Sequence, residues 1–496
     1  MALLHATCQT GVVTDQENPR SPENRSTTPI SEAFRDFIST GWGPAPTPSA
    51  HPLPQARFAS ARRERVSREF PGVTLVIPAG ETQTRSNDTE YPYRPHTAFV
   101  YLTGWGSDTV PGSILLGIPK GTAHDWVLFT RPPAPRTSDE FYANPSIGEF
   151  WTGRRPGLED VGTWLGVETK DRDDWAGEAM PLLANSAVIR EAEGALTDTI
   201  DSLRHTDDQT GDDTLARVIS ELRLVKDEWE IAQLTTAIHA THQGFSRIVA
   251  ALPEASAHPR GERIIEGVFH QAARLEGNDT GYGTIAASGP HACILHWVTN
   301  DGPVMPGHLL LVDAGIELDS LYTADITRTI PVSGRFSPLQ RQIYEAVLDA
   351  ADQAFAVVKP GALFRDIHEA AMRVIADYVH EWGFLPVSLE ESLATEGQHH
   401  RRYMIHGTSH HLGLDVHDCA KARREMYMDK ELEPGMVFTI EPGLYFQPDD
   451  HTVPAEWRGI GVRIEDNIVV TEDGAENLSR DIPRTVDEVE NWVSGR

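Results

Sequence analysis

The sequence predicts an α/β protein in which a smaller N-terminal α/β domain precedes a larger α+β domain. A chain of 496 residues is long enough to bury more than one hydrophobic core. Short apolar runs alternate with helical stretches in the first half, and the second half holds paired strand-like runs that carry acidic residues. We therefore expect an N-terminal extension at residues 1–45, an N-terminal domain at 46–223 and a C-terminal domain at 224–496.

The first part of the chain contains both helix and strand signals. Residues 1–45 are rich in Thr, Ser, Pro, Asn and Gln, which predicts a flexible extension with one short helix at Ser31–Ser39. The composition of Gln55–Arg68 predicts a helix, and the turn-rich, acidic segment His205–Asp213 predicts a surface loop. Apolar runs predict strands at Val73–Gly80, Phe99–Trp105, Ser113–Ile118, Asp125–Thr130 and Ser186–Arg190.

The second part opens with an amphipathic helix within Leu224–Phe245. Its apolar residues recur at helical spacing, as Trp229, Leu234 and Ile238 show. Further helices are predicted at Gly261–Leu275, Pro338–Val358 and Phe364–Trp382, and the segments between and after them read as pairs of strands.

Composition excludes several classes of function. A formal net charge of −30 would repel phosphates, so no nucleic-acid partner is expected. There is no apolar run of about 18 residues and no signal-peptide pattern, so no membrane association is expected. The cysteines Cys8, Cys293 and Cys419 form no CxxC motif, and they fit buried thiols of a reducing compartment, which predicts a cytoplasmic protein.

The first chemical motif is LLLVDAGIELDSLYTADITRT, at 309–329. Asp313 follows a continuous apolar run typical of a buried strand, and Gly315 then permits a tight turn. Asp325 and Thr327 lie on the same strand face, so Thr327 is expected to orient that carboxylate. A carboxylate beside apolar strands needs a cation or a hydrogen-bonding cluster, although two capped turn aspartates are the simpler interpretation.

The second motif is MIHGTSHHLGLDVHD, at 404–418. It holds His406, His410, His411 and His417 within a short span, which favours chemistry over isolated structural histidines. We expect three of these to act in the site and His411 to lie outside it. His399 and His400 stand in a polar stretch and are predicted to be exposed.

The third motif joins FTIEPGLYF, at 438–446, and GIGVRIEDNIVV, at 459–470. Glu441 precedes a rigid Pro-Gly turn, and Arg463 and Glu465 project to the same strand face. The guanidinium is expected to hold the neighbouring carboxylate ionised. A surface Arg–Glu pair is the alternative, but the flanking Ile and Val residues favour burial.

These motifs also repeat in layout. The segments around Asp313 and Asp325 resemble those around Glu441 and Glu465, because each half gives two strands with one carboxylate apiece, although the spacings differ. This predicts a pseudo-twofold domain. Upstream, GYGTIAASGPHACILHW places His296 after an apolar run, where the residues alone favour a structural histidine.

Together the motifs supply four carboxylates and one imidazole, each in a strand-like segment: Asp313, Asp325, His410, Glu441 and Glu465. Such a donor set suits two hard or borderline divalent cations, Mn²⁺ most naturally. A pair of close metal ions favours hydrolysis.

The motifs read in order resemble the pita-bread metallopeptidases, specifically the aminopeptidase P family, from about Arg57 to the C-terminus. The matching segments are ILHW, VDAG, TADITRT, HGTSHHLGLDVHD, TIEPGLY and GVRIED, with RSNDTEYPYRPHTAFVYLTGW in the N-terminal half and DIPRTVDEVE near the end. The resemblance implies a creatinase/prolidase-like N-terminal domain and a pita-bread catalytic domain.

The family resemblance also implies roles for individual residues. The five ligands above would hold two metal ions, with Asp325 and Glu465 bridging them. Histidines at positions 296, 406 and 417 match active-site histidines that bind substrate and manage protons, which replaces the structural interpretation of His296. Tyr282, Tyr445 and Arg463 match positions that line or support the substrate pocket. The implied reaction is removal of the N-terminal residue from peptides with proline second, with Glu441 as general base.

The chain departs from the family pattern in two places. The step from Asp313 to Asp325 is one residue longer than usual, which predicts a bulge or a longer hairpin. His411 stands where bacterial relatives often carry tryptophan, so a different pocket wall is expected.

Three alternative functions are compatible with the same scaffold. Prolidase, which cleaves Xaa-Pro dipeptides, shares the ligands but tends to carry longer insertions between the last three. A creatinase-like relative, or a non-catalytic binding protein on the same scaffold, would have lost ligands that this chain retains. Related enzymes are typically dimers or tetramers, so a homo-oligomer is expected.

Overall fold

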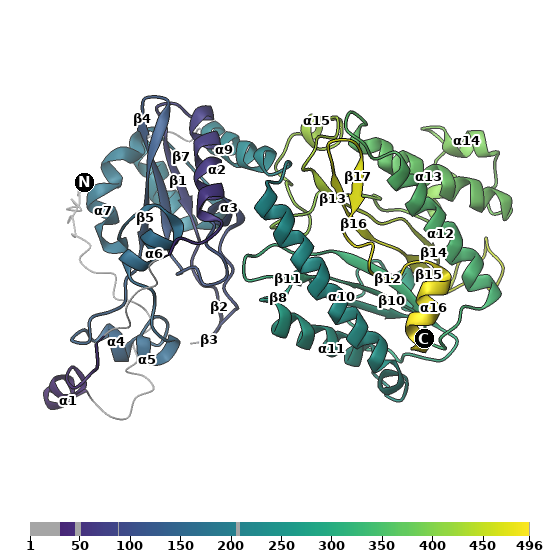
Figure 1. Ribbon diagram of the computed structural model, residues 1–496, viewed down its shortest axis with the longest axis horizontal. Coiled ribbons are helices and arrows are strands. Elements are labelled where there is room, and N and C mark those ends of the chain that lie inside the picture. The colour runs from purple at the N-terminus through teal and green to yellow at the C-terminus, as the bar shows by residue number, and fades with distance from the viewer. Residues whose placement is uncertain (1–29, 45–50, 88, 205–208, 496) are drawn as a thin grey trace, which may run out of the picture.

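The computed structural model describes residues 30–44, 51–87, 89–204 and 209–495. Figure 1 shows a smaller N-terminal lobe on one side and a larger C-terminal lobe on the other, joined where α9 leads into α10. The expected extension falls largely outside the described residues, but its predicted helix is present as α1, at Glu32–Ile38. Among the described residues, no helix combines the length and apolar character needed to cross a membrane.

The elements of the N-terminal lobe are α1 (Glu32–Ile38), α2 (Ala56–Glu69), β1 (Thr74–Pro78), β2 (Thr84–Ser86), β3 (Thr89–Glu90), α3 (Thr97–Thr103), β4 (Ile114–Lys120), β5 (Ala123–Thr130), α4 (Glu140–Ala143), α5 (Glu149–Thr152), α6 (Leu158–Leu165), β6 (Glu168–Asp171), α7 (Trp175–Glu178), β7 (Ser186–Val188), α8 (Gly194–Arg204) and α9 (Thr210–Leu222).

The N-terminal lobe is built on a mixed sheet with the strand order β6-β5-β4-β1-β7. The strand pairs β1–β4 and β4–β5 are antiparallel, and β1–β7 and β5–β6 are parallel. Side chains alternate along β1, so Leu75 and Ile77 pack into one core while Val76 packs into another on the opposite face. The centre of the sheet is therefore buried on both faces, which explains why β1 and most of β4 are continuous apolar runs, whereas the edge strand β6 is polar.

Two predictions for this lobe are wrong. The segment Phe99–Trp105 was expected to be a strand, but Thr97–Thr103 forms helix α3, whose seven residues are all buried. His96 accepts a hydrogen bond from the Ala98 N–H at the start of α3, and Gly104 ends it with φ of 72°. The expected loop His205–Asp213 lies partly outside the described residues, and its last residues belong to α9.

The elements of the C-terminal lobe are α10 (Glu228–Ser256), α11 (Gly261–Glu276), β8 (Asp279–Thr280), β9 (Ile285–Ser288), β10 (Leu309–Ala314), β11 (Ile316–Glu317), β12 (Ile326–Pro331), α12 (Pro338–Ala356), α13 (Phe364–Glu381), α14 (Leu389–Leu393), α15 (Arg424–Tyr427), β13 (Val437–Ile440), β14 (Gly443–Phe446), β15 (Ile460–Arg463), β16 (Asp466–Val470), β17 (Ala475–Asn477) and α16 (Val486–Ser494).

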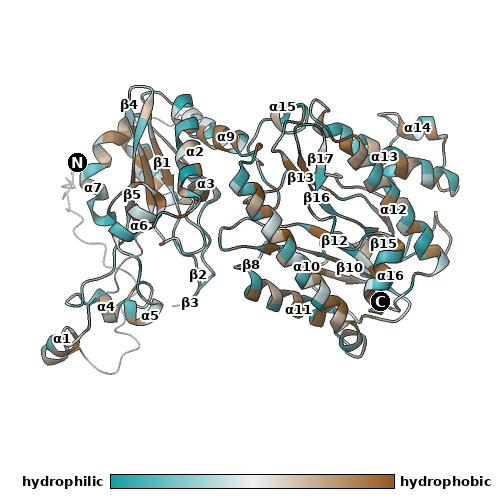
Figure 2. Cartoon of the chain, viewed as in Figure 1, coloured by the Kyte–Doolittle hydropathy of each residue, from teal (hydrophilic) through white to brown (hydrophobic). Residues whose placement is uncertain are grey.

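The C-terminal lobe places short antiparallel sheets inside a layer of helices (Figure 1). Helices α10 and α11 pack together, as do α12 and α13, and their apolar faces share one core with the strands. The first helix starts at Asp227, whose carboxylate accepts hydrogen bonds from the N–H groups of Trp229 and Glu230. Figure 2 shows the strands of both lobes mainly brown and the helices divided between brown and teal, as amphipathic helices require.

The two halves of this lobe each contribute an antiparallel pair, as the repeated layout predicted. Strand β10 pairs with β12, and β13 pairs with β16. The two halves contact each other where the Asn467 side chain makes two hydrogen bonds to the backbone of Asp325. The Asn467 side-chain amide donates to the Asp325 carbonyl at 2.6 Å, and the Asn467 side-chain oxygen accepts from the Asp325 N–H at 3.2 Å. This clasp brings the acidic residues of both halves together.

The long step between Asp313 and Asp325 is a longer hairpin without a bulge, because the β10–β12 register is unbroken from Leu309↔Pro331 to Ala314↔Ile326. Gly315 was expected to permit a tight turn, but the structure requires glycine there for a different reason. A Cβ at this position would lie 1.7 Å from the Ala324 carbonyl oxygen, so Gly315 is required by a close backbone approach.

Candidate active site

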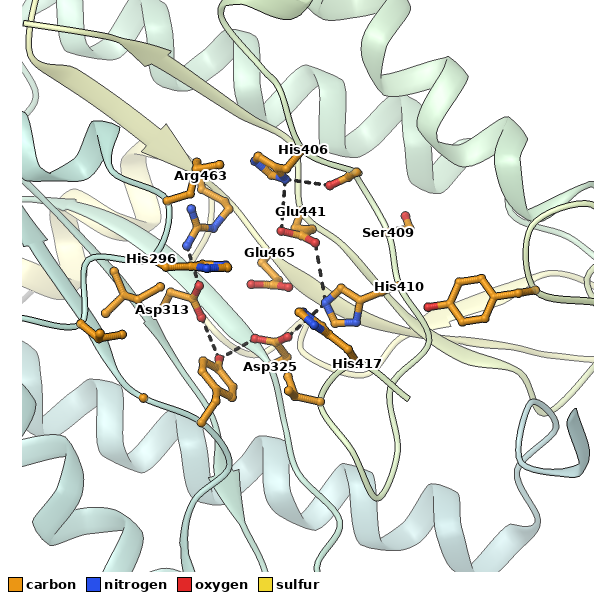
Figure 3. Close-up of a pocket in the computed structure, with 18 residues that line it drawn as sticks. His296, Asp313, Asp325, His406, Ser409, His410, His417, Glu441, Arg463 and Glu465 are labelled. Carbon is orange, nitrogen blue, oxygen red and sulfur yellow. Dashed lines mark hydrogen bonds and ion pairs between the residues drawn. The ribbon is translucent and has the colours of Figure 1, made fainter. Parts of the chain in front are cut away.

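The acidic candidates lie where strands end. Asp313 lies near the end of β10 and Asp325 just before β12, while Glu441 follows β13 and Glu465 separates β15 from β16. Figure 3 shows these side chains pointing toward one another. His410 was predicted to lie in a strand-like segment, but it lies in a loop beside β13, where its N–H donates to the Thr439 hydroxyl at 3.2 Å.

All of the candidate residues except Tyr445 line one cavity of about 750 Å³. The candidates on its wall are Tyr282, His296, Asp313, Asp325, His406, His410, His417, Glu441, Arg463 and Glu465. Segments separated by more than 150 residues in sequence therefore converge, as the motifs predicted.

The centre of the cavity holds a compact group of potential metal ligands. One ligand atom each from Asp325, His410 and Glu465 lie within 4.8 Å of one another. His410 Nε2 is 3.3 Å from Asp325 Oδ2 and 3.6 Å from Glu441 Oε1. The Tyr282 hydroxyl lies between Asp313 Oδ1 and Asp325 Oδ1, at 2.7 and 2.5 Å.

The shifted pKa values of these buried carboxylates favour a bound cation. Burial, followed by repulsion from neighbouring carboxylates, raises the pKa of Glu465 well above its ordinary value. Burial also raises the pKa of Glu441 to about 7, although His410 and Arg463 oppose this rise. Burial alone would lower the pKa of His410, but Asp325 and Glu441 raise it to about 9. Positive charge among these buried carboxylates would therefore stabilise their ionised forms. Oxygen donors with one imidazole are the ligands that hard or borderline divalent ions prefer, so these residues fit such ions.

A hydrogen-bonded chain leads from this centre to the rim. The Arg463 guanidinium, which is 3% exposed, donates to Asp313 Oδ2 at 2.5 Å and to the Tyr445 hydroxyl at 3.1 Å. Tyr445 in turn contacts His406 Nε2 at 2.7 Å, and His406 Nδ1 donates to the Gly407 carbonyl. Burial and the nearby Arg463 lower the pKa of His406 to about 3, so this histidine is neutral.

Two predicted partnerships are therefore wrong. Arg463 was expected to hold Glu465 ionised, but it pairs with Asp313. Thr327 was expected to orient Asp325, but its hydroxyl donates to Glu465 Oε2 at 2.7 Å. Thr327 lies directly opposite Asp313 in the β10–β12 ladder, and its side chain reaches the other half of the lobe.

The histidines separate as follows. His296 and His417 line the cavity from exposed positions, and the ring of His417 lies 4.4 Å from that of His410. His411 lies outside the cavity, as predicted, and its ring stacks on that of Phe364 at 4.5 Å. The expectation that His411 changes the pocket wall is therefore wrong. The prediction that His399 and His400 are exposed is wrong. His400 is 6% exposed and bonds Ser392, and His399 is half-buried.

The segment that carries His296 is fixed by Glu262, a residue that the sequence analysis missed. This carboxylate is fully buried on α11 and accepts four hydrogen bonds at 2.7 to 2.9 Å, from the N–H groups of Ser288 and Gly302 and the rings of His291 and Trp297. His291 and Trp297 are also stacked at 3.9 Å. A helical Glu among polar residues gave no local signal of this role.

The cavity wall also includes Ser409 and Tyr427, which the sequence analysis missed. Ser409 directly precedes His410 in the histidine-rich motif, so its place in the sequence could have indicated it. Nothing near Tyr427 in the sequence indicated that residue. The hydroxyl of Ser409 is buried and has no hydrogen-bond partner among the described residues. Tyr427 accepts a hydrogen bond from the His411 N–H at 3.0 Å.

The fold and the site together define a metallopeptidase. The model of metallopeptidase family M24 matches residues 232–472, and the model of the aminopeptidase P N-terminal domain matches residues 59–189.

Individual relatives agree with this class. The chain is 46% identical to Xaa-Pro aminopeptidase 1 of Streptomyces coelicolor, over 96% of this chain and 98% of that protein. It is 34% identical to the Xaa-Pro aminopeptidase of Escherichia coli, over 88% and 97%. Among solved structures it resembles aminopeptidase P from E. coli with the inhibitor Pro-Leu, with a TM-score of 0.77, 32% identity and coverage of 89% and 99%. Pseudomonas aeruginosa aminopeptidase PepP gives a TM-score of 0.76 at 31% identity, with coverage of 90% and 99%. The chain belongs to the Xaa-Pro aminopeptidases of metallopeptidase family M24.

Proposed function

We propose that this enzyme is a metal-dependent aminopeptidase that removes the N-terminal residue from peptides with proline in the second position. The observation that carries the proposal is the convergence of buried carboxylates and one imidazole in an open cavity, in a chain nearly half identical to an Xaa-Pro aminopeptidase over its whole length.

The ligand assignment is part of the proposal. Two divalent ions, most naturally Mn²⁺, would be held by Asp313, Asp325, His410, Glu441 and Glu465, because this donor set is rich in oxygen and lacks thiolates. When bound, such ions act as Lewis acids and lower the pKa of water.

The remaining residues are assigned to positioning and proton transfer. Glu441 accepts a proton from the attacking water. Tyr282 orients Asp313 and Asp325, and Arg463 positions Asp313 through a buried ion pair.

The exposed rings of His296 and His417, with neutral His406, contact the substrate. His417 helps to pass to the proline nitrogen, as the bond breaks, the proton that Glu441 took from the water. Tyr445 fixes the orientation of the His406 ring, because its hydroxyl makes a hydrogen bond with His406 Nε2. A proline nitrogen in a peptide bond carries no hydrogen, so it cannot leave without gaining one.

We further propose the domain limits 46–223 and 224–496 after an extension at 1–45, a cytoplasmic location and assembly into a homodimer or homotetramer. Exposed aromatic side chains on α1 and α5 support assembly: Phe37 is 79% and Trp151 is 61% exposed. Mass measurement by light scattering tests the assembly.

The activity is tested with an Xaa-Pro tripeptide and an Xaa-Pro dipeptide in parallel, each with added Mn²⁺ and with a chelator. Cleavage of the tripeptide that depends on metal supports the proposal. Cleavage of the dipeptide alone would make the enzyme a prolidase, and activity that survives complete chelation would overturn the metal-ligand assignment.

A further inference from the structure

A second cavity adjoins the active site. It measures about 1000 Å³ and lies between α13, the segment 393–401 and the start of α15. The two cavities share His406, Gly407 and Ser409. This cavity, hereafter the arginine groove, is lined by no metal ligand and by none of the other proposed site residues apart from His406.

The segment shared by the two cavities, hereafter the rim, has open space beside Gly407. Gly407 is exposed, and a Cβ placed on it would meet only the Ser409 carbonyl oxygen, at 3.9 Å. Beside it, the buried Ser409 hydroxyl lacks a hydrogen-bond partner among the described residues. A buried hydroxyl without a partner is costly, so a ligand that crosses here gains by supplying one.

The charge of the arginine groove is opposite to that of the protein. The net charge of the chain is −30, yet the groove is lined by Arg365, Arg373, Arg401 and Arg424 against one acidic residue, Glu369. Neighbouring acids outside the lining offset part of this charge, since Asp429 lies 3.2 Å from Arg365 and 3.9 Å from Arg424, and Asp377 lies 3.6 Å from Arg373.

These ion pairs leave the groove able to bind an anion. They are largely exposed, and exposed pairs contribute little, so they exchange readily for a ligand carboxylate. Arg401 has no carboxylate partner among the described residues, and its guanidinium contacts only Gln398 Oε1 at 2.5 Å and the Ile405 carbonyl at 3.5 Å.

The geometry points to a substrate path. If the enzyme removes one N-terminal residue, only that residue lies before the cleaved bond, and the peptide beyond the proline must extend out of the catalytic cavity. We propose that this remaining part crosses the rim at Gly407 and that the arginine groove binds its carboxylates, either acidic side chains or the free C-terminus. The inference rests on the proposed function and adds a preference for acidic peptides.

The test compares kcat/KM for Ala-Pro-Glu-Glu, Ala-Pro-Gln-Gln and Ala-Pro-Lys-Lys, each with a free and an amidated C-terminus. The Glu peptide is expected to exceed the Lys peptide by roughly tenfold, mainly through KM, because several exposed charge pairs act together. This preference should shrink at high salt. Loss of rate on amidation of the Gln peptide assigns binding to the C-terminal carboxylate, and a dependence on Glu in the amidated series assigns it to side chains.

Variants locate the effect. In the double variant Arg373→Gln/Arg401→Gln the Glu-to-Lys ratio should fall by about threefold or more, whereas Arg401→Lys, which keeps the charge, should retain most of it. Arg274→Gln is the matched control, because Arg274 is an exposed arginine on α11 that lines neither cavity.

Equal kcat/KM for all peptides, or a preference as large in the double variant as in Arg274→Gln, would overturn the inference. Failure of the proposed function is distinguishable, because no Xaa-Pro peptide of any charge would then be cleaved, and both proposals would fall.

Discussion

The substitution Glu262→Gln tests whether a single buried carboxylate organises the segment that carries His296. Glu262 Oε1 accepts from the Ser288 N–H and His291 Nδ1, and Oε2 accepts from the Trp297 ring and the Gly302 N–H. A glutamine retains one acceptor oxygen and presents an amide donor to the other pair.

The cost depends on which pair meets the amide. Facing Trp297 and Gly302, the amide would leave two donors unpaired, because neither group can accept. Facing Ser288 and His291, it would leave only the Ser288 N–H, because a neutral His291 can change tautomer and accept at Nδ1. The second orientation is favoured, and one buried unpaired donor lowers the free energy of unfolding by about 1–3 kcal/mol.

Urea denaturation of both proteins measures this difference, and kcat/KM with an Xaa-Pro tripeptide reports whether His296 is displaced. The matched control is Glu266→Gln on the same helix, whose carboxylate pairs with Arg263 at 3.0 Å near the surface and should cost no more than about 1 kcal/mol. If Glu262→Gln unfolds at the same urea concentration as the control, the four hydrogen bonds do not organise this segment.

Three further outcomes are expected. Glu441→Gln should lower kcat by about 10²–10⁴-fold in the metal-loaded enzyme, as loss of a general base does; a decrease of less than tenfold would remove Glu441 from that role. Lys226→Met should lower the free energy of unfolding by about 2 kcal/mol, because Asp418 loses the hydrogen bond from the fully buried Lys226 ammonium at 3.0 Å but keeps its ion pair with Arg223; a change below about 0.5 kcal/mol would contradict a tight pair. Hydrogen bonds from Arg402 hold the pKa of Asp450 below its usual range, so this carboxylate stabilises the fold above its unfolded-state pKa of about 4 and the stabilisation is lost as the pH falls. The destabilisation by Asp450→Asn should therefore be largest near pH 7 and shrink below pH 4, and a difference independent of pH would count against this ion pair.

Much of the fold is readable from the sequence, because local signals decide most elements. The apolar runs that became β1, β4 and β5 are bounded by turns, and the helix from Glu228 begins at the capping residue Asp227. The failure at Thr97–Thr103 has a physical cause. Every residue of α3 is buried, so the helix shows no polar face and its periodicity disappears.

For the site as well, local features were predictable from the sequence and long-range contacts were not. Acidic residues at strand ends predicted where the centre would form, and the structure brings them together. Their partners were not predictable, because they depend on how distant strands align. Arg463 reaches Asp313 across 150 positions of sequence, and Thr327 reaches Glu465 across 138. Neighbouring residues on one strand suggested other pairs, which the register between strands overrides.

The clasp between the two halves of the C-terminal lobe has a consequence for biosynthesis. Glu465, which joins Asp325 and His410 in the central group, comes from the second half of this lobe, 140 residues after Asp325 in the sequence, since 465 − 325 = 140. Domains fold as the polypeptide emerges with its N-terminus first. A nascent chain that has emerged only as far as the first half of the lobe therefore lacks this carboxylate, and the central group cannot form before the second half has left the ribosome.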